Sequence, residues 1–154
     1  MKTKNSATEL IAPCGMNCAL CSSYLALQND VKNKGVKMPY CEGCRPRDKQ
    51  CAFLKKQCEK LLNHDVVYCY ECTDFPCENL KKIDHRYQKF YKMSFIENLQ
   101  AIEKNGVDRF FNEQQKKWQC PTCDGTICCH NGLCFHCDIV ALQKKKKRYR
   151  WEDE

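Results

Sequence analysis

The chain has 154 residues, of which sixteen are cysteine, and it carries a formal net charge of +7. This length is about that of one ordinary domain, and the cysteine content is typical of a chain held together by disulfides or metal ions. The composition excludes a disordered chain, a collagen-like chain and a membrane-spanning helix, because no apolar run approaches the ~20 residues that a span needs.

Recurring Cys-x-x-Cys pairs help to decide which kind of cross-link to expect. They are Cys18/Cys21, Cys41/Cys44, Cys69/Cys72, Cys120/Cys123 and Cys134/Cys137. Two thiolates three positions apart can grip one tetrahedral ion from a single tight turn, and a disulfide framework does not need that repetition. The N-terminus lacks the apolar stretch of a secretory signal, so we expect a cytoplasmic protein, in which disulfides are rare. The sequence therefore predicts metal sites, with structural disulfides as the alternative.

The cysteines and charges suggest four regions along the chain. Residues 1–12 are polar and are expected to form a flexible arm. Residues 13–92 contain ten cysteines and residues 93–143 contain six, and we expect these two parts to fold as one compact unit. Residues 144–154 form a basic tail.

Apolar residues at helical spacing predict most of the regular structure. The predicted helices cover residues 20–28, 51–63, 76–92, 95–105 and 107–117, and a further helix follows from residue 138. Ser94 and Glu97 have the spacing of a capping box, and Asn105-Gly106 is a typical helix stop. Aromatic residues at helical spacing are interpreted as core.

Two segments predict extended structure. Residues 66–68 favour a short strand, and Asn131-Gly132 is a strong hairpin signal. We therefore expect a small, α-rich α+β fold, in which zinc-knuckle and zinc-ribbon elements staple short helices and a β-hairpin together.

The sharpest metal prediction lies near the C-terminus. Cys120/Cys123 and Cys134/Cys137 are separated by ten residues and can wrap one Zn²⁺ as a Cys₄ site. Two alternatives stay open. One pair could serve a different site, or Cys120/Cys123 could be a thioredoxin-type redox pair.

The expected hairpin also sorts the neighbouring side chains by face. Since side chains alternate along a strand, a two-residue turn at Asn131-Gly132 places Cys128 and His130 on one face and Cys129 and Cys134 on the other. Cys128 and His130 are thus candidates for a second metal, away from the ribbon.

The N-terminal cysteines form less distinct groups. Cys14, Cys18 and Cys21 form a Cys-x₃-Cys-x₂-Cys triplet that needs a fourth ligand. Candidates for that ligand are Cys128, His130 and Cys77.

The remaining pairs suggest two further sites. Cys41/Cys44 and Cys69/Cys72 can share one ion, and Cys51, Cys58 and Cys77 would fill a last site. Cys51 and Cys58 are seven residues apart and lie on the same side of a helix, so the alternative for them is small core residues. His64, His85 and His136 are interpreted as surface residues.

Enzyme signatures are weak, so the sequence leaves catalysis uncertain and favours a non-enzyme. There is no Ser-His-Asp set, phosphate-binding Gly-rich loop or His-Glu-x-x-His motif, and Cys-saturated zinc sites are closed. The triplet also has the spacing with which radical-SAM enzymes hold a [4Fe–4S] cluster, but the chain is too short for their partial barrel. A cluster without radical chemistry stays an alternative, because four thiolates suit iron–sulfur as well as zinc.

The positive charge is weak evidence for a polyanion partner. The formal +7 counts every cysteine as neutral, and zinc-bound thiolates would offset it. The run Lys144–Arg150 suits phosphate contacts or an anionic surface, and its alternative is a solvated helix end.

Three stretches of sequence resemble one protein family. They are Ile11-Ala12-Pro13-Cys14-Gly15-Met16-Asn17-Cys18-x-x-Cys21 with Tyr24, then Cys41-x-Gly43-Cys44 and Tyr68-Cys69-x-Glu71-Cys72-x-x-Phe75-Pro76-Cys77, and last Lys117-Trp118-x-Cys120-Pro121-x-Cys123-x-Gly125-x-x-Cys128-x-His130-x-Gly132-x-Cys134-x-x-Cys137. Over about residues 11–137 the chain resembles DUF3795, cysteine-rich prokaryotic proteins of unknown function. The resemblance implies a bacterial or archaeal cytosolic protein that binds zinc, and it implies no activity.

The resemblance also completes the candidate ligand set. Its pattern includes Cys128 and His130 but not Cys129, in agreement with the hairpin argument. The candidate ligands are Cys14, Cys18, Cys21, Cys41, Cys44, Cys51, Cys58, Cys69, Cys72, Cys77, Cys120, Cys123, Cys128, His130, Cys134 and Cys137. This set suffices for up to four tetrahedral zinc sites.

The leading hypothesis is a non-enzymatic, multi-zinc scaffold that binds a partner, with a protein favoured over nucleic acid. The first alternative is an iron–sulfur protein in electron transfer or redox sensing. The second is a zinc-dependent nucleic-acid-binding protein that uses the basic tail.

Overall fold

The computed structural model describes residues 7–43, 58–63 and 65–151. Some predicted features lie outside the described residues. They are residues 1–6 of the arm, the start of the helix 51–63, His64, residues 152–154 of the tail, and the candidate ligands Cys44 and Cys51. The helices in chain order are α1 (Ala7–Leu10), η1 (Cys18–Leu20), α2 (Ser22–Gln28), η2 (Val31–Lys34), α3 (Glu59–Leu62), η4 (Cys69–Glu71), α4 (Glu78–Tyr91), α5 (Phe95–Asn105), α6 (Val107–Lys117) and α7 (Ile139–Lys144).

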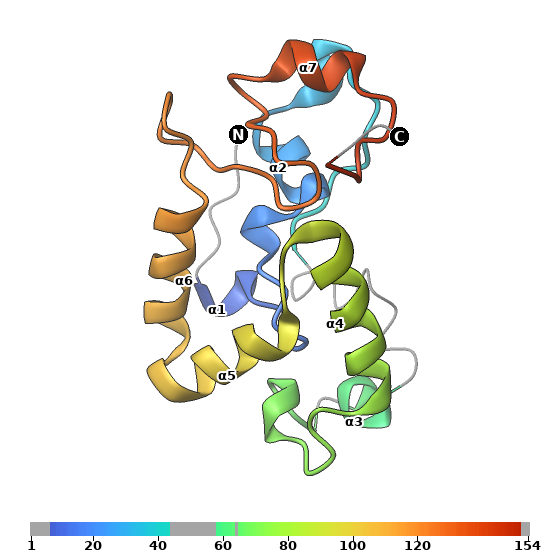
Figure 1. Ribbon diagram of the computed structural model, residues 1–154, viewed down its shortest axis with the longest axis vertical. Coiled ribbons are helices and arrows are strands. Elements are labelled where there is room, and N and C mark those ends of the chain that lie inside the picture. Colours follow the sequence, from blue (N-terminus) through green and yellow to red (C-terminus); the bar gives the residue numbers. More distant parts are fainter. Residues whose placement is uncertain (1–6, 44–57, 64, 152–154) are drawn as a thin grey trace.

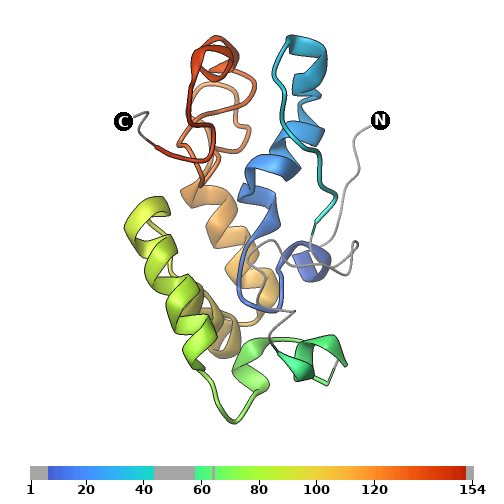
Figure 2. The same ribbon diagram turned by 90° about the vertical axis from the view of Figure 1, so that its right-hand side faces the viewer.

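The two ends of the molecule are built from different sets of helices. Helices α4, α5 and α6 form the lower part, while α2 and α7 lie at the upper end (Figure 1). Helix α3 and η4 lie at the end opposite α2 and α7 (Figure 2). One apolar cluster joins the N-terminal segment to α4, α5 and α6. A second cluster joins α2 and η2 to Phe135 and Leu142.

The expected α+β fold is wrong for the part of the chain that the structure describes. That part contains helices and no strand, and its extended pairing is limited to three isolated β-bridges, Ile11–Asn17, Gln119–Thr126 and Ile127–Cys134. The short strand expected at residues 66–68 is absent. The backbone N–H groups of Val67 and Tyr68 instead donate to the Glu71 carboxylate, at 3.3 and 2.9 Å, and so cap η4.

The hairpin expected at Asn131-Gly132 is also absent. Gly132 N–H donates to the Cys128 carbonyl at 2.8 Å, and Cys129 N–H donates to the Leu20 carbonyl at 3.0 Å. A third donor, His130 N–H, points at the Cys128 sulfur at 3.3 Å. The N–H groups of Gly132, Cys129 and His130 therefore bond to a turn carbonyl, to a distant carbonyl and to a sulfur. None of these three groups pairs with a neighbouring strand, as a hairpin would require.

The two helices predicted from residues 95–105 and 107–117 are confirmed as α5 and α6. Ser94 caps α5, since its hydroxyl accepts from Glu97 N–H at 3.1 Å. The buried Asp84 carboxylate on α4 accepts from the Ser94 hydroxyl at 2.9 Å and from Ile96 N–H at 3.1 Å. One buried carboxylate thus fixes the middle of α4 against the start of α5.

The N-terminal cysteine turn packs directly on α5 through Gly15. This residue has φ +92°, and a Cβ there would lie 2.8 Å from the Phe95 carbonyl and 3.0 Å from the Leu99 side chain. The Asn98 side chain donates to the Gly15 carbonyl at 3.0 Å. The turn that carries Cys14 and Cys18 therefore needs glycine at this position.

The Gly15 contact predicts a large effect from one methyl group. Gly35→Ala places alanine at φ +80° in open space, so it should lower the free energy of unfolding by about 1–2 kcal/mol. Gly15→Ala adds overpacking against α5 and should cost a further ~1–3 kcal/mol. Urea unfolding of both variants measures the difference, and equal losses would contradict the close packing.

Candidate metal centres

Four cysteines come together where the chain leaves α6 and approaches α7. The Sγ atoms of Cys120, Cys123, Cys134 and Cys137 all lie within 4.8 Å of one another. The Cys123–Cys134 separation is 3.6 Å and the Cys120–Cys137 separation is 4.0 Å. Four sulfurs at 2.3 Å around a tetrahedral ion lie about 3.8 Å apart. The grouping predicted from the sequence is confirmed, and these four thiols can bind a metal ion.

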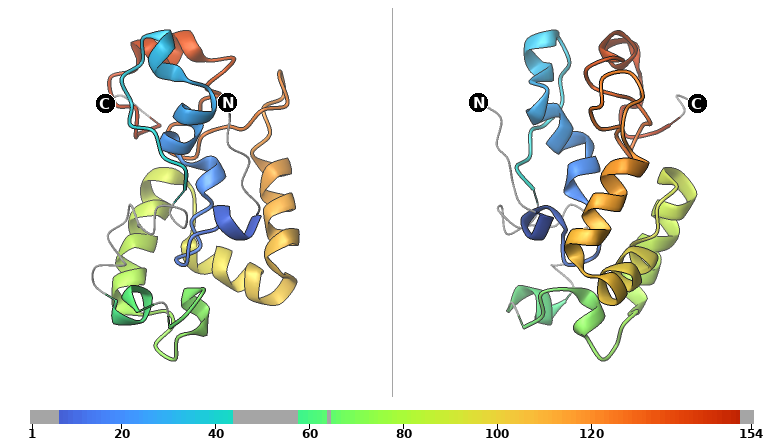
Figure 3. Two further views of the ribbon diagram at one scale, coloured as in Figure 1. Left: turned by 180° about the vertical axis from the view of Figure 1, so that it is seen from behind. Right: turned by 90° about the vertical axis from the view of Figure 1, so that its left-hand side faces the viewer.

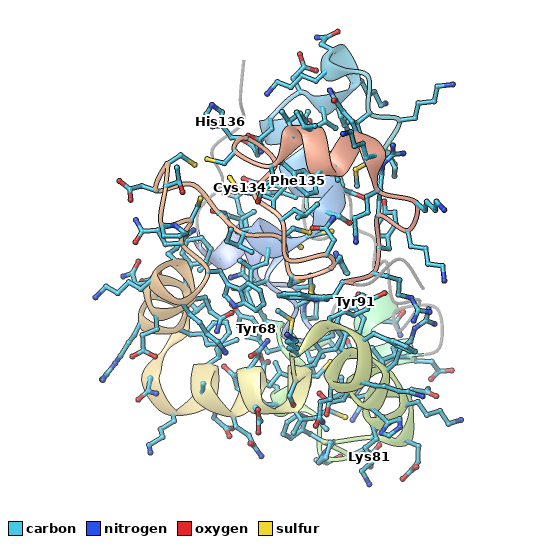
Figure 4. The ribbon with its side chains drawn as sticks, turned by 45° about the horizontal axis from the view of Figure 1, so that its top comes forward. Tyr68, Lys81, Tyr91, Cys134, Phe135 and His136 are labelled. Atoms are coloured by element: carbon cyan, nitrogen blue, oxygen red, sulfur yellow. The ribbon has the colours of Figure 1, made fainter. Side chains whose placement is uncertain are left out.

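Tight turns aim backbone N–H groups at these sulfurs. Gly125 N–H points at Cys123 Sγ and Cys137 N–H points at Cys134 Sγ, each at 3.4 Å. The first turn is closed by Cys120 N–H, which donates to the Gly125 carbonyl at 2.8 Å. Figure 4 shows Cys134, Phe135 and His136 on the loop that leads into α7. Such N–H donors stabilise thiolates, which are the form of cysteine that binds metal.

The thiols of this group differ in acidity. Backbone N–H groups of Cys123 and Thr122 lower the pKa of Cys120 to about 7. The neighbouring Cys123 thiol, followed by burial, raises the pKa of Cys137 to about 12. A second negative charge is thus costly beside the first, unless a cation lies between the sulfurs.

A second group of thiols surrounds a small cavity of about 20 Å³ near η4. The cysteines that line it are Cys58, Cys69, Cys72 and Cys77. The Lys60 ammonium lies 3.2 Å from Cys72 Sγ, and Asp74 N–H points at the same sulfur at 3.4 Å. The hydrogen bond to Cys72 raises the pKa of Lys60. The structure therefore groups Cys69/Cys72 with Cys58 and Cys77, whereas the sequence had suggested Cys41/Cys44 as their partners.

A third group of thiols faces a larger cavity, of about 350 Å³. Cys14 comes from the turn after α1, Cys18 from η1, Cys21 from the start of α2, and Cys41 from the segment after η2. The same wall contains Arg86, Tyr87 and Tyr91 of α4, together with His130 and Tyr149. Figure 3 shows that α2 and the C-terminal segment lie side by side at this end of the molecule.

His130 is buried in this wall with a partner at each ring nitrogen. Its Nδ1 lies 3.2 Å from Ser22 N, whose N–H donates to it, and its Nε2 lies 3.2 Å from the Tyr87 hydroxyl. Because Nδ1 accepts, the ring proton of the neutral imidazole is on Nε2. Burial lowers the pKa of His130 to about 4, so the ring is neutral at pH 7.

Cys128 and Cys129 differ from the arrangement that the hairpin argument predicted. Cys128 packs in the apolar cluster with Leu25 and Phe135, and burial raises its pKa to about 12. Cys129 packs in the other cluster with Cys14 and Cys21. Burial and then the nearby sulfurs of Cys128 and Cys21 raise the pKa of Cys129 well above its usual value. Cys128 and His130 as metal ligands stay predictions.

The basic tail folds back onto the molecule as far as the structure describes it. The Trp151 indole N–H donates to the Cys129 carbonyl at 2.9 Å, and the Asn131 side chain donates to the Arg148 carbonyl at 2.8 Å. The Tyr149 hydroxyl lies 3.3 Å from the Ser23 hydroxyl, at the rim of the large cavity. The Arg150 guanidinium lies 3.8 Å from the Phe90 ring centroid. These residues are thus part of the fold.

Sequence patterns do not reveal the non-cysteine residues that line the large cavity. Tyr87 and Tyr91 belong to an apolar helical stripe, which is typical of core, and Tyr149 belongs to a charged run. No local pattern marks Arg86. Their position depends on contacts between segments more than forty residues apart.

Fold and sites together define a helical, cysteine-rich protein with one compact Cys₄ group. The model of the DUF3795 family, described as a protein of unknown function, matches residues 10–82, which confirms for this region the family expected from the motifs. The match includes the thiols from Cys14 to Cys77 and ends before the Cys₄ group. No curated protein and no solved structure matches the chain. None of the helices in the described ranges is long and apolar enough to cross a membrane.

The thiol pKa values predict pH-dependent metal binding at the Cys₄ group. The metal affinity should fall as the pH decreases from about 8 to 6, because protons compete for Cys120 near pH 7 and for Cys137 at higher pH. Competition against a chromophoric chelator measures the affinity at each pH. An affinity that does not change over this range would contradict thiolate ligation.

The docked tail predicts a local effect of Gly132. This residue has φ +73°, and an added Cβ would collide with the Trp151 ring. Gly132→Ala should release the tail and speed trypsin cleavage within residues 144–150 by about tenfold, the equivalent of ~1.4 kcal/mol of lost docking. Gly106→Ala, at φ +88° in open space, is the matched control and should leave this cleavage rate unchanged. Equal rates in the two variants would show that Trp151 does not hold the tail.

Proposed function

We propose that the protein is a non-enzymatic scaffold stabilised by zinc, with one Zn²⁺ at Cys120, Cys123, Cys134 and Cys137. The mutual approach of these four sulfurs is the observation that carries the proposal. Four thiolates at tetrahedral separations suit Zn²⁺ and leave no open position for a substrate. The role of such an ion is structural.

The loops that this ion would join contain no helix or strand. Between α6 and α7, the backbone forms turns, a hydrogen bond from Cys129 N–H to the Leu20 carbonyl, and the isolated bridges at Gln119–Thr126 and Ile127–Cys134. The same segment places Phe135 in the second apolar cluster and His130 in the wall of the large cavity. A metal crosslink between Cys120/Cys123 and Cys134/Cys137 would therefore stabilise the part of the cavity wall that contains His130, which we call the roof of the cavity.

The second group of thiols is proposed as a further zinc site. Its cavity of about 20 Å³ has room for one ion or one water molecule. Cys58, Cys69, Cys72 and Cys77 would supply four sulfur ligands, and the Lys60 ammonium offsets part of the negative charge of the thiolates. This site lies at the end of the molecule opposite α7 (Figure 2).

The scaffold offers a cavity rather than an apolar surface for binding. The large apolar side chains that are exposed among the described residues are Val67, Val140 and Tyr149. Val67 precedes η4 and Val140 lies on α7, at opposite ends of the molecule. A protein partner stays a prediction from the sequence. Arg148 donates to the Leu142 carbonyl and Arg150 packs over the Phe90 ring, so these two cations are less available to bind the phosphates of a nucleic acid.

Metal counting and thermal unfolding test the proposal. We expect the protein to contain about two equivalents of zinc, and Cys134→Ser to contain about one fewer. Chelation should lower the melting temperature by about 10–20 °C, because the energy of binding structural zinc is also folding energy. Cys129→Ala is the matched control, since it removes a buried thiol that is outside both the Cys₄ group and the candidate ligand set. Unchanged zinc content in Cys134→Ser would contradict the proposed site.

A further inference from the structure

The large cavity presents four thiols that the zinc scaffold does not use. Its volume of about 350 Å³ is more than ten times that of the cavity near η4. Such a volume is typical of pockets that hold a polyatomic ligand. A single metal ion coordinated by four sulfurs needs no cavity of this size.

The thiols reach this cavity from successive turns of the N-terminal segment and from one distant segment. Cys14, Cys18 and Cys21 lie on the turn after α1, on η1 and at the start of α2, and Cys41 lies on the segment after η2. Among the described residues, neither these thiols nor those near η4 share the mutual 4.8 Å approach found at the Cys₄ group. What separates the two sites is the volume, about 350 Å³ here against about 20 Å³ near η4. A [4Fe–4S] core binds each thiolate through a different iron, and it therefore needs ligands spread further apart than a single ion does.

The environment of these thiols also fits a cationic inorganic core. Cys14, Cys18, Cys21 and Cys41 are only 1, 2, 8 and 6 % exposed. Four buried thiolates need a compensating positive charge, and the charged side chain in the described wall is the single Arg86 guanidinium. An iron–sulfur core supplies positive charge among the sulfurs. Gly43 N–H points at Cys41 Sγ at 3.3 Å, as backbone donors do toward thiolate ligands.

The rest of the wall would shield such a core from water. Met16, Phe95 and the tyrosines provide an apolar and aromatic surface. The Tyr149 ring lies 5.8 Å from the His130 ring at the rim, and the docked tail holds it there. Solvent exclusion and hydrogen bonds to sulfur are the two means by which proteins tune such clusters.

We propose that Cys14, Cys18, Cys21 and Cys41 hold a [4Fe–4S] cluster in this cavity. On transfer of a [4Fe–4S]²⁺ core, four Fe–S bonds replace four S–H bonds and four protons are released, with no change in oxidation state. The inference is independent of the zinc sites, because it uses none of their ligands.

Metal analysis of protein purified without oxygen, and then incubated with Fe³⁺, sulfide and a thiol that reduces half of the iron to Fe²⁺, tests the inference. We expect about four iron and four sulfide per chain, together with a broad absorption band near ~400 nm. Cys14→Ser, Cys18→Ser, Cys21→Ser and Cys41→Ser should each lower the iron content at least threefold. The zinc at the Cys₄ group should persist, which reports that each variant is folded.

Two matched controls separate this cluster from its neighbours. Cys129→Ser changes a buried thiol that packs beside Cys21 but does not line the cavity, and it should keep its iron. Cys134→Ser should lose zinc at the Cys₄ group, so failure of the zinc proposal is visible separately. Zinc in place of iron at the cavity thiols, iron without sulfide, or iron that survives all four cavity substitutions would overturn the proposed cluster.

Discussion

In the function we propose, the upper end of this molecule depends on the bonding of four thiolates to one cation. The Sγ atoms of Cys120, Cys123, Cys134 and Cys137 lie within 4.8 Å of one another, and two separations, 3.6 and 4.0 Å, are close to the edge of about 3.8 Å in a ZnS₄ tetrahedron. Without a cation, hydrogen bonding with the Cys123 thiol, burial and the other neighbouring sulfurs raise the pKa of Cys137 and oppose its ionisation. A cation among the sulfurs would offset the repulsion between the thiolates and would crosslink the two loops.

The proposed crosslink would hold several buried residues in place, because the two loops supply side chains to both apolar clusters and to the cavity wall. The segment between α6 and α7 supplies Phe135 to one apolar cluster and Cys129 to the other, and it places His130 against Ser22 and Tyr87. The tail then docks on the same segment through Trp151. The position of His130 in the cavity wall and the docking of the tail therefore both depend on the segment that the four sulfurs would crosslink.

The sequence predicted the features that depend on nearby residues. Helices α5 and α6 follow from an apolar stripe with a Ser94 cap, and the Cys₄ group follows from two Cys-x-x-Cys pairs separated by a short loop. The hairpin failed because the backbone N–H groups of Cys129 and His130 have partners that local patterns do not show, the Leu20 carbonyl and a cysteine sulfur. The grouping of Cys69/Cys72 with Cys58 and Cys77, and of Cys41 with the N-terminal triplet, likewise depends on how distant segments pack.

The central claim is that one zinc ion is bound by the four C-terminal thiolates. X-ray absorption at the zinc edge, on Cys77→Ser protein so that the Cys₄ group is the dominant zinc site, tests this claim most directly. We expect four sulfur neighbours at about 2.3 Å and no nitrogen or oxygen neighbour. A mixed shell with histidine nitrogen or water, or fewer than four sulfurs, would contradict the closed site on which the roof of the cavity depends.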